Sequence, residues 1–584
     1  MTKFTLANLN IVILRYRTNL FTMRKTFIAL CVAAFASSAA AQKEQDHNFN
    51  VAKNLNIFNA IYKNLDMMYV DTLDADLTVG TGVNAMLKAL DPYTVYYPED
   101  KVKDLKFMIT GKYGGIGALI KYNSQLKRVT IDEPYENMPA AEVGLKKGDI
   151  ILSIDNEDMT KKDQGYVSDH LRGDPGTSFI LQIKRPSTGK VMKFKVVRKA
   201  IQSPAVPYYG MQANGVGYIN LSGFTENCSR EVRRAFLDLK QQGMKSLVFD
   251  LRGNGGGSES EAVNIVNMFV PKGKLIVSNR GKMQRSNYEY RTQVEPLDTV
   301  MPVVVLVDGN SASASEITCG SLQDLDRAVV LGTRTFGKGL VQMTMDLPYN
   351  SALKLTTAKY YIPSGRCIQA INYKHNNGGT KEHVPDSLTK VFYTANGRPV
   401  RDGGGIMPDV EVKADTLPNI AFYLAGIKDS NEVLLNYQLD YIAKHPTIAQ
   451  PEKFVITDAE YDEFKQRVLN SKFTYDRESE KFLKELVKLA KFEGYYDDAK
   501  NEFNALEKKL SHNIAKDLDI NKEAVKRLIA DGIIPVYYFQ KGRIRHSLVD
   551  DKQMKAALEV LADSKRYASL LKPQPKTTPA KTKK

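Results

Sequence analysis

Two short segments of the chain contain residue types that could carry out hydrolysis. The segment Asn310-Ser-Ala-Ser-Ala-Ser-Glu316 places three hydroxyl groups soon after the apolar run 303–307. The segment Thr335-Phe-Gly-Lys-Gly-Leu-Val-Gln342 holds Lys338 between two glycines, shortly after another apolar run, 328–331. A serine becomes a nucleophile when a nearby base removes its proton, and a lysine is such a base once it is neutral. The two segments therefore predict a Ser/Lys hydrolase.

The serine-rich segment also has a purely structural interpretation. Ser313-Ala-Ser-Glu316 fits a capping box, in which the serine and the glutamate satisfy the first free N–H groups of a helix. On the local sequence alone this interpretation is the stronger one. If the segment is catalytic, Ser311 and Ser315 are the alternative hydroxyls. The choice therefore depends on the partner segment.

The lysine segment has an alternative interpretation as a nucleotide site. Residues 332–338 fit Gly-x-x-x-x-Gly-Lys after a strand, the beginning of a phosphate-binding loop. However, Gly339 replaces the Ser or Thr that would bind magnesium, and residues 340–345 are typical of a strand rather than a helix. Both departures remove the physical basis for holding a nucleotide, so this interpretation is disfavoured.

The elements that must position these segments alternate between strand and helix from about residue 205 to 420. The apolar runs predict strands at 215–221, 246–250, 303–307 and 328–331, and helices at 226–242, through Val263 and Met268, and from Ser313 onward. Such alternation favours a layered α/β core. Apolar residues at helical spacing predict helix over 50–90, and residues 420–566 are charge-rich and helical in pattern.

The formal net charge of +16 comes largely from the two ends of the 584-residue chain. Residues 1–41 contain five basic residues and no acid, and the stretch from Lys572 adds five lysines, which leaves +6 for the residues between them. So diffuse a charge, without interleaved aromatic residues, argues against nucleic-acid binding. The seven histidines form no metal-ligand pattern, and the three cysteines after residue 41 form no Cys-x-x-Cys pair. We therefore expect no metal and no cofactor.

Residues 23–41 have the pattern of a secretory signal, with a basic start, an apolar middle and an Ala-x-Ala end. Cleavage is expected before Gln42, and residues 1–22 fit the pattern so poorly that Met23 is a candidate start. An uncut signal would tether the protein to a membrane, but the apolar run is short for a span. The bulky residue before Cys31 argues against lipid attachment. We predict an exported, periplasmic protein.

Together the two chemical segments closely resemble the carboxyl-terminal processing (tail-specific) peptidases, whose signature has this Ser-Ala-Ser-Ala-Ser-Glu block and Thr-Phe-Gly-Lys-Gly loop. Lys338 follows Ser313 by 25 residues, as in that family, and Gln342 occupies the position of a supporting glutamine. Residues 353–366 and 405–409 match as well, and the resemblance spans about residues 50–415. It implies a ClpP/crotonase-like fold, with Ser313 as the nucleophile and Lys338 as the base.

Peptide hydrolysis also needs N–H donors for the oxyanion that develops on the carbonyl. We expect the amide of Ala314 and the amide of one of two glycines, Gly256 or Gly257. The two glycines belong to the glycine-rich run that follows the predicted strand 246–250.

Residues 113–120 and 140–155 together resemble a PDZ domain, the first as its carboxylate-binding loop and the second as its characteristic strand. Successive glycines expose N–H groups that can hold a chain-terminal carboxylate, while the peptide adds a strand to the sheet edge. The resemblance implies substrate binding at Gly115, Ile116 and Gly117, and it places Arg172 where family members couple PDZ occupancy to the active site. The alternative for the glycine motif is a hairpin that binds no ligand. The alternative for Arg172 is an ordinary charge on the protein surface.

The sequence as a whole predicts an α/β multidomain protein: a peptidase core with an inserted, mainly-β PDZ domain and helical N- and C-terminal regions. Its predicted function is that of an exported serine endopeptidase that binds and cuts protein substrates with exposed carboxyl-terminal tails; the alternative is an inactive PDZ scaffold. A homodimer, an adaptor protein and peripheral membrane association are left open. The predicted segments are a signal (1–41), a helical region (42–100), the PDZ domain (101–200), the core (201–420), a helical domain (421–566) and a disordered basic tail (567–584).

Overall fold

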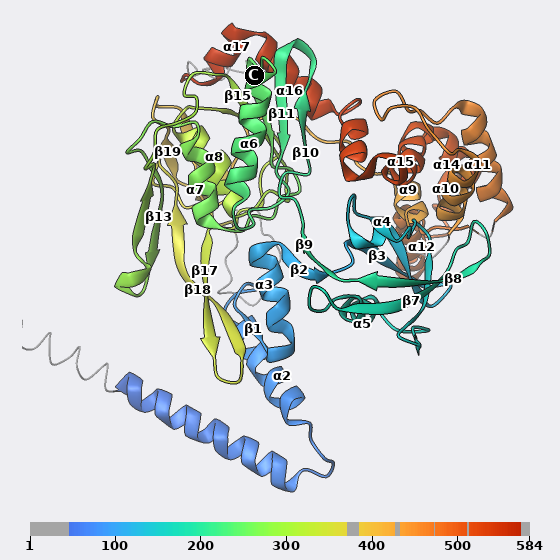
Figure 1. Ribbon diagram of the computed structural model, residues 1–584, viewed down its shortest axis with the longest axis horizontal. Coiled ribbons are helices and arrows are strands. Elements are labelled where there is room, and N and C mark those ends of the chain that lie inside the picture. Colours follow the sequence, from blue (N-terminus) through green and yellow to red (C-terminus); the bar gives the residue numbers. More distant parts are fainter. Residues whose placement is uncertain (1–45, 371–384, 427–431, 472, 511–512, 574–584) are drawn as a thin grey trace, which may run out of the picture. The chain divides into compact units, whose positions relative to one another are not determined.

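The computed structural model describes residues 46–370, 385–426, 432–471, 473–510 and 513–573 (Figure 1). The chain divides into two units, residues 1–87 and 88–584. The predicted signal, residues 1–41, lies outside the described residues. In the first unit the apolar pattern of 50–90 forms two helices rather than one, at 46–68 and in α2 (Ala75–Lys88).

A six-stranded sheet forms the centre of the second unit. Its strands lie in the order β10-β11-β12-β15-β16-β21, and all neighbours from β11 to β21 run parallel, whereas β10 is antiparallel at one edge. The four predicted strands of the core are confirmed as β11, β12, β15 and β16. The strand bounds are β10 (Tyr208–Met211), β11 (Val216–Asn220), β12 (Ser246–Asp250), β15 (Val303–Val307), β16 (Val329–Gly332) and β21 (Val410–Glu411).

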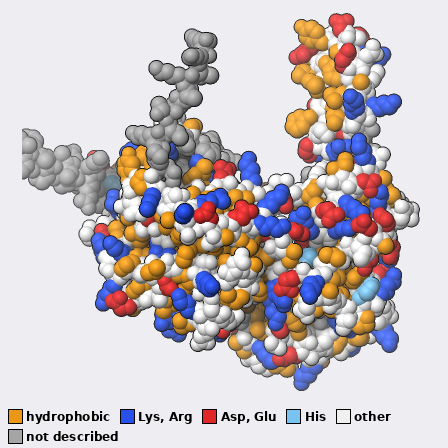
Figure 2. Space-filling view, turned by 90° about the horizontal axis from the view of Figure 1, so that it is seen from above, with side chains coloured by type: hydrophobic (Ala, Val, Ile, Leu, Met, Phe, Trp, Pro, Cys, Tyr) orange, Lys and Arg blue, Asp and Glu red, His pale blue; other side chains and the backbone are white. Residues whose placement is uncertain are grey.

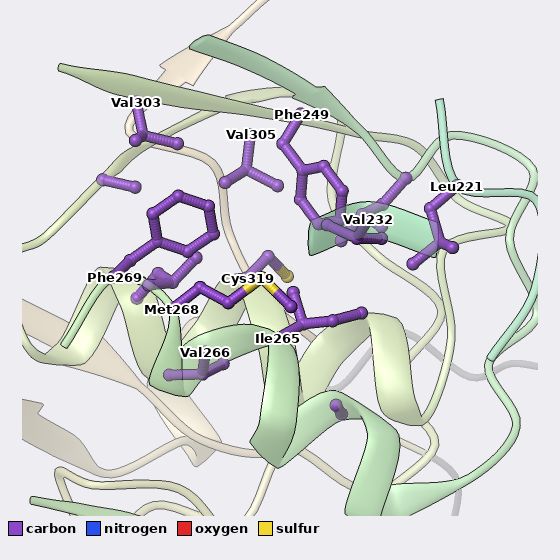
Figure 3. Packing of buried hydrophobic residues seen from close by; sticks show 14 of the residues in the cluster. Leu221, Val232, Phe249, Ile265, Val266, Met268, Phe269, Val303, Val305 and Cys319 are labelled. Atoms are coloured by element: carbon purple, nitrogen blue, oxygen red, sulfur yellow. The ribbon is translucent and has the colours of Figure 1, made fainter. Parts of the chain in front are cut away.

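Three helices cover one face of this sheet. Successive strand residues point to opposite faces, so Val303 and Val305 of β15 join the cluster on the helical side while Val304 joins the cluster on the other. Figure 3 shows Val303 and Val305 above Ile265 and Cys319, which come from the helices. The predicted helices are confirmed, with the bounds α6 (Cys228–Gln241), α7 (Glu259–Asn267) and α8 (Ala314–Asp324).

The opposite face of the sheet is covered by the last two helices of the chain, α16 (Lys552–Ala562) and α17 (Ser564–Leu570). Met554, Ala557 and Val560 pack against the strands there. The predicted boundary at residue 566 is therefore wrong, because α17 continues past it and the Tyr567 hydroxyl accepts a hydrogen bond from the Val303 amide at 3.0 Å. A parallel sheet is apolar on both faces, so both faces need a cover. The tail beyond residue 573 lies outside the described residues.

A second sheet carries the strand that follows the lysine loop. Its order is β1-β18-β13-β14, with β17 also paired to β18, and all pairs are antiparallel. Strand β17 begins at Leu340, as the sequence predicts in place of a helix. The bounds are β1 (Val95–Tyr97), β13 (Leu275–Gly281), β14 (Tyr288–Arg291), β17 (Leu340–Leu347) and β18 (Ser351–Tyr361), with a small separate hairpin of β19 (Val391–Tyr393) and β20 (Pro399–Arg401).

Residues 112–202 form the predicted mainly-β domain around their own apolar cluster. The sheet has the order β3-β4-β5-β7-β8, with β6 paired to β5, and β2 pairs separately with β9. Helix α3 (Val102–Thr110) precedes this domain. The bounds are β2 (Lys112–Gly115), β3 (Ala118–Asn123), β4 (Arg128–Pro134), α4 (Pro139–Glu142), β5 (Ile150–Ile154), β6 (Glu157–Asp158), α5 (Gln164–Leu171), β7 (Ser178–Lys184), β8 (Val191–Val197) and β9 (Lys199–Gln202).

The charge-rich region after residue 418 is helical, as predicted, and most of it packs around a separate cluster rich in aromatic residues. Helices α16 and α17 pack on the core sheet instead, and Ile544 near the end of α15 packs against the cluster on that sheet. The remaining bounds are α9 (Asn419–Leu424), α10 (Val433–Lys444), α11 (Asp458–Asn470), α12 (Glu478–Glu493), α13 (Lys500–Leu510), α14 (Ile514–Ile520) and α15 (Lys522–Ser547).

Three features of the described residues bear on partners and ligands. No helix within them is both long and apolar enough to cross a bilayer. They also contain no group of three or more His, Cys, Asp or Glu side chains placed to hold a metal ion. Figure 2 shows acidic and basic side chains interspersed over the face in view.

Candidate active site

Ser313 lies where β15 leads into α8, and it is the N-cap residue of that helix. Its backbone has φ = 57° and ψ = −113°, a conformation that residues with side chains rarely adopt and that costs energy. Gly256, in the loop after β12, packs directly against it. A Cβ on Gly256 would lie 2.8 Å from Ser313 Cβ and 2.9 Å from the Ala314 nitrogen. The glycine run therefore permits a close approach to the serine segment.

The three serines of the segment have different surroundings. Ser311 Oγ donates to the Leu251 carbonyl and Ser315 Oγ donates to the Asn254 carbonyl, each at 2.8 Å, and both serines are fully buried. Ser313 is partly exposed and lines a cavity of about 590 Å³. Of the three hydroxyls, the one on Ser313 is therefore accessible to a substrate.

The predicted capping box is present, with Ser313 as the cap and Glu316 as its partner. The Ser313 amide donates to Glu316 Oε2 at 2.9 Å. The reciprocal contact of the box, from the Glu316 amide to the Ser313 hydroxyl, is also present, without the full geometry of a hydrogen bond. The cap thus orients the Ser313 backbone and leaves its hydroxyl available, so the structural and the chemical interpretations of this serine coexist.

Glu316 connects the serine segment to the lysine loop. Its Oε2 accepts from the amides of Ser313 and Lys338, both at 2.9 Å, and its Oε1 accepts from the Gly337 amide at 2.7 Å and the Thr335 hydroxyl at 2.5 Å. Burial raises the pKa of Glu316, and these four donors oppose that rise. Because four donors point at two oxygens, the surroundings suit the ionised carboxylate.

Gln369 and Ala370 hold the lysine loop from its other side. A Cβ on Gly337 would lie 2.3 Å from the Ala370 Cβ, and one on Gly339 would lie 2.9 Å from the Gln369 nitrogen. The Gly339 amide donates to Gln369 Oε1 at 2.6 Å. The two glycines around Lys338 therefore allow the close-packed loop that the sequence predicts.

Lys338 lies in surroundings that disfavour its positive charge. Burial, together with the nearby Lys354, lowers the pKa of Lys338 to about 8, although Glu316 and Asp91 act in the opposite direction. Its Nζ lies 4.3 Å from the centroid of the Tyr93 ring, within the range of a cation–π contact. A lysine with this pKa is neutral often enough near pH 7–8 to serve as a base.

The three predicted catalytic residues, Ser313, Lys338 and Gln342, line one cavity. Gln342 Nε2 donates to Thr356 Oγ1 at 3.2 Å. Among the described residues, Lys338 Nζ makes its close contact with the Tyr93 ring and is not hydrogen-bonded to the Ser313 hydroxyl. The fold thus assembles the residues, with the lysine amine directed at an aromatic ring.

The predicted oxyanion donors line the same cavity. Ala314 belongs to the first turn of α8, where backbone N–H groups have no partner within the helix. The Gly256 amide donates to Asn254 Oδ1 at 2.9 Å. On either side of Gly257, the Gly256 carbonyl accepts from the Phe224 amide and the Ser258 amide donates to the Phe224 carbonyl. Of the two glycines, Gly256 therefore already has an acceptor for its N–H group.

Comparison with known proteins gives these motifs a family. The model of peptidase family S41 matches residues 215–379, which hold the serine segment and the lysine loop. The chain is 35% identical over 359 residues to the carboxy-terminal-processing protease of Bartonella bacilliformis, covering 61% of this chain and 81% of that protein. The chain belongs to peptidase family S41. It is a serine-type carboxyl-terminal processing peptidase.

Other matches to this S41 peptidase cover the regions around its core. A PDZ model matches residues 130–185, and a model described as "Probable PDZ-protease, C-terminal helical domain" matches residues 420–561. A CtpA-like serine protease of Staphylococcus aureus (strain N315) is 32% identical, over 60% of this chain and 69% of that protein. The solved photosystem II D1 C-terminal processing protease is 25% identical over 62% of this chain and 88% of that one, with a TM-score of 0.34.

In this S41 peptidase the predicted carboxylate loop connects β2 to β3, and it contains Gly115, Ile116 and Gly117. Gly117 has φ = 68°, and a Cβ there would lie 2.5 Å from the Met138 side chain. The carbonyl of Ile116 accepts from the Ala140 amide at 2.8 Å, which leaves the loop anchored on its carbonyl side. Strand β3 is an edge strand of its sheet, as an added peptide strand requires.

Arg172 follows α5 and contacts the helix that precedes the PDZ domain. Its Nη1 lies 3.2 Å from Asp104 Oδ1, and its guanidinium lies over the Phe107 and Tyr113 rings at 5.4 and 5.2 Å. Asp104 and Phe107 belong to α3, whose Leu105, Met108 and Ile109 line the catalytic cavity. A single helix therefore contacts both Arg172 and the cavity of the S41 peptidase.

Two residues beside the S41 site, Glu316 and Tyr93, have contacts there that the sequence does not predict. Glu316 was expected only as a helix cap, because its bonds to the lysine loop join segments that no local pattern relates. Tyr93 lies in Asp91-Pro-Tyr-Thr94, just after the region that the sequence predicts to be helical, and no motif there assigns it to a site. The sequence indicates a turn there, because an aspartate precedes an aromatic residue and a threonine. It does not indicate that the turn lies beside the distant lysine.

Proposed function

We propose that this S41 peptidase hydrolyses peptide bonds with a Ser313/Lys338 dyad. The observation that carries the proposal is that the one accessible hydroxyl of its segment shares a cavity with a lysine whose pKa is lowered to about 8. Neutral Lys338 takes the Ser313 proton as Oγ attacks the peptide carbonyl, and later donates it to the leaving amine. Gln342 orients the lysine from β17.

We assign the oxyanion hole to the amides of Ala314 and Gly257. Both residues line the cavity beside Ser313, whereas the Gly256 amide already donates to Asn254. Two backbone donors fixed in place before the reaction stabilise the developing charge without reorganisation. Gly256 then has a packing function, because a Cβ there would collide with Ser313.

The proposed substrates are unstructured protein chains with a free carboxyl terminus. The terminus binds at Gly115, Ile116 and Gly117, and the residues before it add a strand to β3. The catalytic cavity has an apolar wall, formed by side chains of α3 together with Phe224, Ile317 and Leu340. This wall suits an apolar side chain next to the bond that is cut.

Arg172 is proposed to report PDZ occupancy to the catalytic cavity. Its contacts with Asp104 and Phe107 end on α3, and α3 lines that cavity. A peptide that moves Arg172 when it binds therefore also moves the wall of the cavity. This is how PDZ occupancy would be coupled to the active site, as the resemblance implies.

We place the enzyme outside the cytoplasm, in the periplasm, on the signal pattern of residues 23–41. Cleavage before Gln42 releases it, and an uncut signal tethers it to the membrane. A homodimer, an adaptor protein and peripheral membrane association stay predictions.

The test is cleavage of one unstructured protein by the wild type and by Ser313→Ala, with the apolar tail of the substrate either free or capped by charged residues. The proposal predicts cleavage that depends on the free tail and is absent from Ser313→Ala. Tail binding without cutting in either enzyme would support the scaffold instead. Cutting that ignores the tail would reject carboxyl-end recognition, and cutting by Ser313→Ala would reject the dyad.

A further inference from the structure

The aromatic ring over Lys338 is held in place by a tightly bonded turn. Asp91 Oδ1 accepts from the amides of Tyr93 and Thr94, both at 2.8 Å, and Asp91 Oδ2 accepts from the Thr94 hydroxyl at 2.9 Å. Asp91 and Thr94 are buried, and Tyr93 is half-buried. The carboxylate therefore fixes the backbone on both sides of the tyrosine.

Strand pairing places this turn beside the lysine loop. Val95, the first residue of β1, pairs with Lys354 of β18, and the Thr356 amide donates to Thr94 Oγ1 at 3.2 Å. Thr356 pairs in turn with Gln342 of β17, the strand that begins two residues after Lys338. The geometry between Tyr93 and Lys338 is thus set by three adjacent strands and not by flexible side chains alone.

The ring opposes the function that Lys338 has in the dyad. A π-face attracts an ammonium and gives no comparable attraction to a neutral amine, so the contact stabilises the protonated lysine. Among the charged groups that face Lys338, Asp91 in the same turn and Glu316 of α8 also favour the charge, whereas Lys354 of β18 and burial disfavour it. A general base must lose its proton and reach the serine hydroxyl, and both steps require leaving the ring.

We propose that Tyr93 is a positioning residue that holds the Lys338 ammonium away from Ser313 until a substrate occupies the cavity. The proposal rests on the Ser313/Lys338 dyad and adds a control on that dyad. Substrate reaches the same segment of chain, because α3, which begins a few residues after β1, supplies Leu105, Met108 and Ile109 to the cavity wall. Occupancy of the cavity releases the amine from the ring and lets it bond to the serine hydroxyl.

The test is a series of substitutions at Tyr93 in the full chain: Tyr93→Leu, Tyr93→Phe and Tyr93→Trp. Cleavage of an internally quenched peptide with a free apolar carboxyl terminus is measured across pH 6–10. The acid limb of kcat/KM reports the base in the free enzyme, and the limb of kcat reports the base in the substrate complex. Because the ring raises the pKa of Lys338, its removal moves the kcat/KM limb to lower pH.

Tyr93→Leu is expected to shift the kcat/KM limb by about 0.4–1.5 pH units to lower pH, the range that a cation–π contact supports. Tyr93→Phe retains a π-face and is expected to overlay the wild type. Tyr93→Trp, with the strongest π-face, shifts the limb to higher pH, and it adds the sole tryptophan to a chain that has none. The limb of kcat stays fixed in all three, since the lysine has left the ring in the substrate complex.

Unshifted limbs of kcat/KM in both Tyr93→Leu and Tyr93→Trp would overturn the proposal. So would equal shifts in kcat and kcat/KM, because the ring would then act on the lysine throughout the reaction. If Tyr93→Leu fails to fold, the comparison of Tyr93→Phe with Tyr93→Trp still decides. Ser313→Ala is measured in parallel. Continued cleavage by Ser313→Ala would reject the dyad itself. An inactive Ser313→Ala enzyme, together with unshifted kcat/KM limbs in the Tyr93 variants, would reject only the function of Tyr93.

Discussion

Replacement of Glu316 by glutamine tests whether one buried carboxylate holds the two catalytic segments together. Glu316 is fully buried and accepts four hydrogen bonds, from Ser313, Thr335, Gly337 and Lys338. In Glu316→Gln the amide keeps one oxygen with two acceptor positions and turns an NH₂ group toward the remaining donors. Two of the four donors therefore lose their partners.

A buried donor that is left unsatisfied costs about 1–3 kcal/mol, so Glu316→Gln is expected to lower the free energy of unfolding by about 2–6 kcal/mol. The chain offers a matched control in Glu460, which occupies the same third position in the capping box of Thr457 at the start of α11. Glu460 is half-buried, and its carboxylate accepts from the Thr457 amide and hydroxyl and from the Tyr441 hydroxyl, without contacting a second segment of the catalytic cavity. Glu460→Gln preserves a residue type that suits this position, so its expected cost is below about 0.5 kcal/mol.

The assay is urea unfolding of both variants and the wild type, followed by circular dichroism, with peptide cleavage measured at urea concentrations where each remains folded. Glu316→Gln should be both less stable and nearly inactive while folded, because the Ser313 and Lys338 backbones lose their shared acceptor. Equal unfolding midpoints for Glu316→Gln and Glu460→Gln, with full activity in the former, would show that Glu316 does not hold the two segments together.

Three further predictions follow from the charged groups of the structure. Since burial lowers the pKa of Lys338 to about 8 and the base is the neutral amine, kcat/KM should rise with pH through about 8; a plateau already reached below pH 6.5 would contradict this. Arg172→Ala removes the contacts with Asp104 and Phe107. The ratio of the cleavage rates for the free-tail and the capped-tail substrate should therefore fall toward one. An unchanged ratio would reject the coupling between the PDZ domain and the cavity. Arg366→Met leaves the buried carboxylate of Asp324 without its ion pair and should lower the free energy of unfolding, measured in urea, by about 3–5 kcal/mol. Lys488→Met breaks an exposed pair with Glu485 and should lower it by less than about 1 kcal/mol. Similar losses in the two variants would show that burial does not determine the cost of breaking an ion pair.

The elements that carry Ser313 were predictable because their signals are local. Five consecutive apolar residues mark β15 as a buried parallel strand, and the cap residue and its glutamate mark the start of α8. The resemblance then paired Ser313 with Lys338, two residues that no local pattern connects. The strand after Lys338 was also recognisable, and it excluded a nucleotide loop.

The contacts around Lys338 were not predictable, because they join segments far apart in the chain. Thr94 and Thr356, which fix the Tyr93 turn to β18, are 262 residues apart. Likewise, the amphipathic pattern of the last helices indicates an apolar face without indicating which surface it covers. The uncovered face of the core sheet decided that α16 and α17 belong to the peptidase core rather than to the helical region before them.

The most direct test of the dyad compares Lys338→Ala with Lys359→Ala, an exposed lysine of the neighbouring strand β18. Both variants and the wild type are assayed at pH 8 on the same free-tail substrate. We expect a loss of about 100- to 10,000-fold for Lys338→Ala, the contribution of a positioned general base, and wild-type activity for Lys359→Ala. Activity of Lys338→Ala close to that of the wild type would contradict the proposal that this lysine activates Ser313.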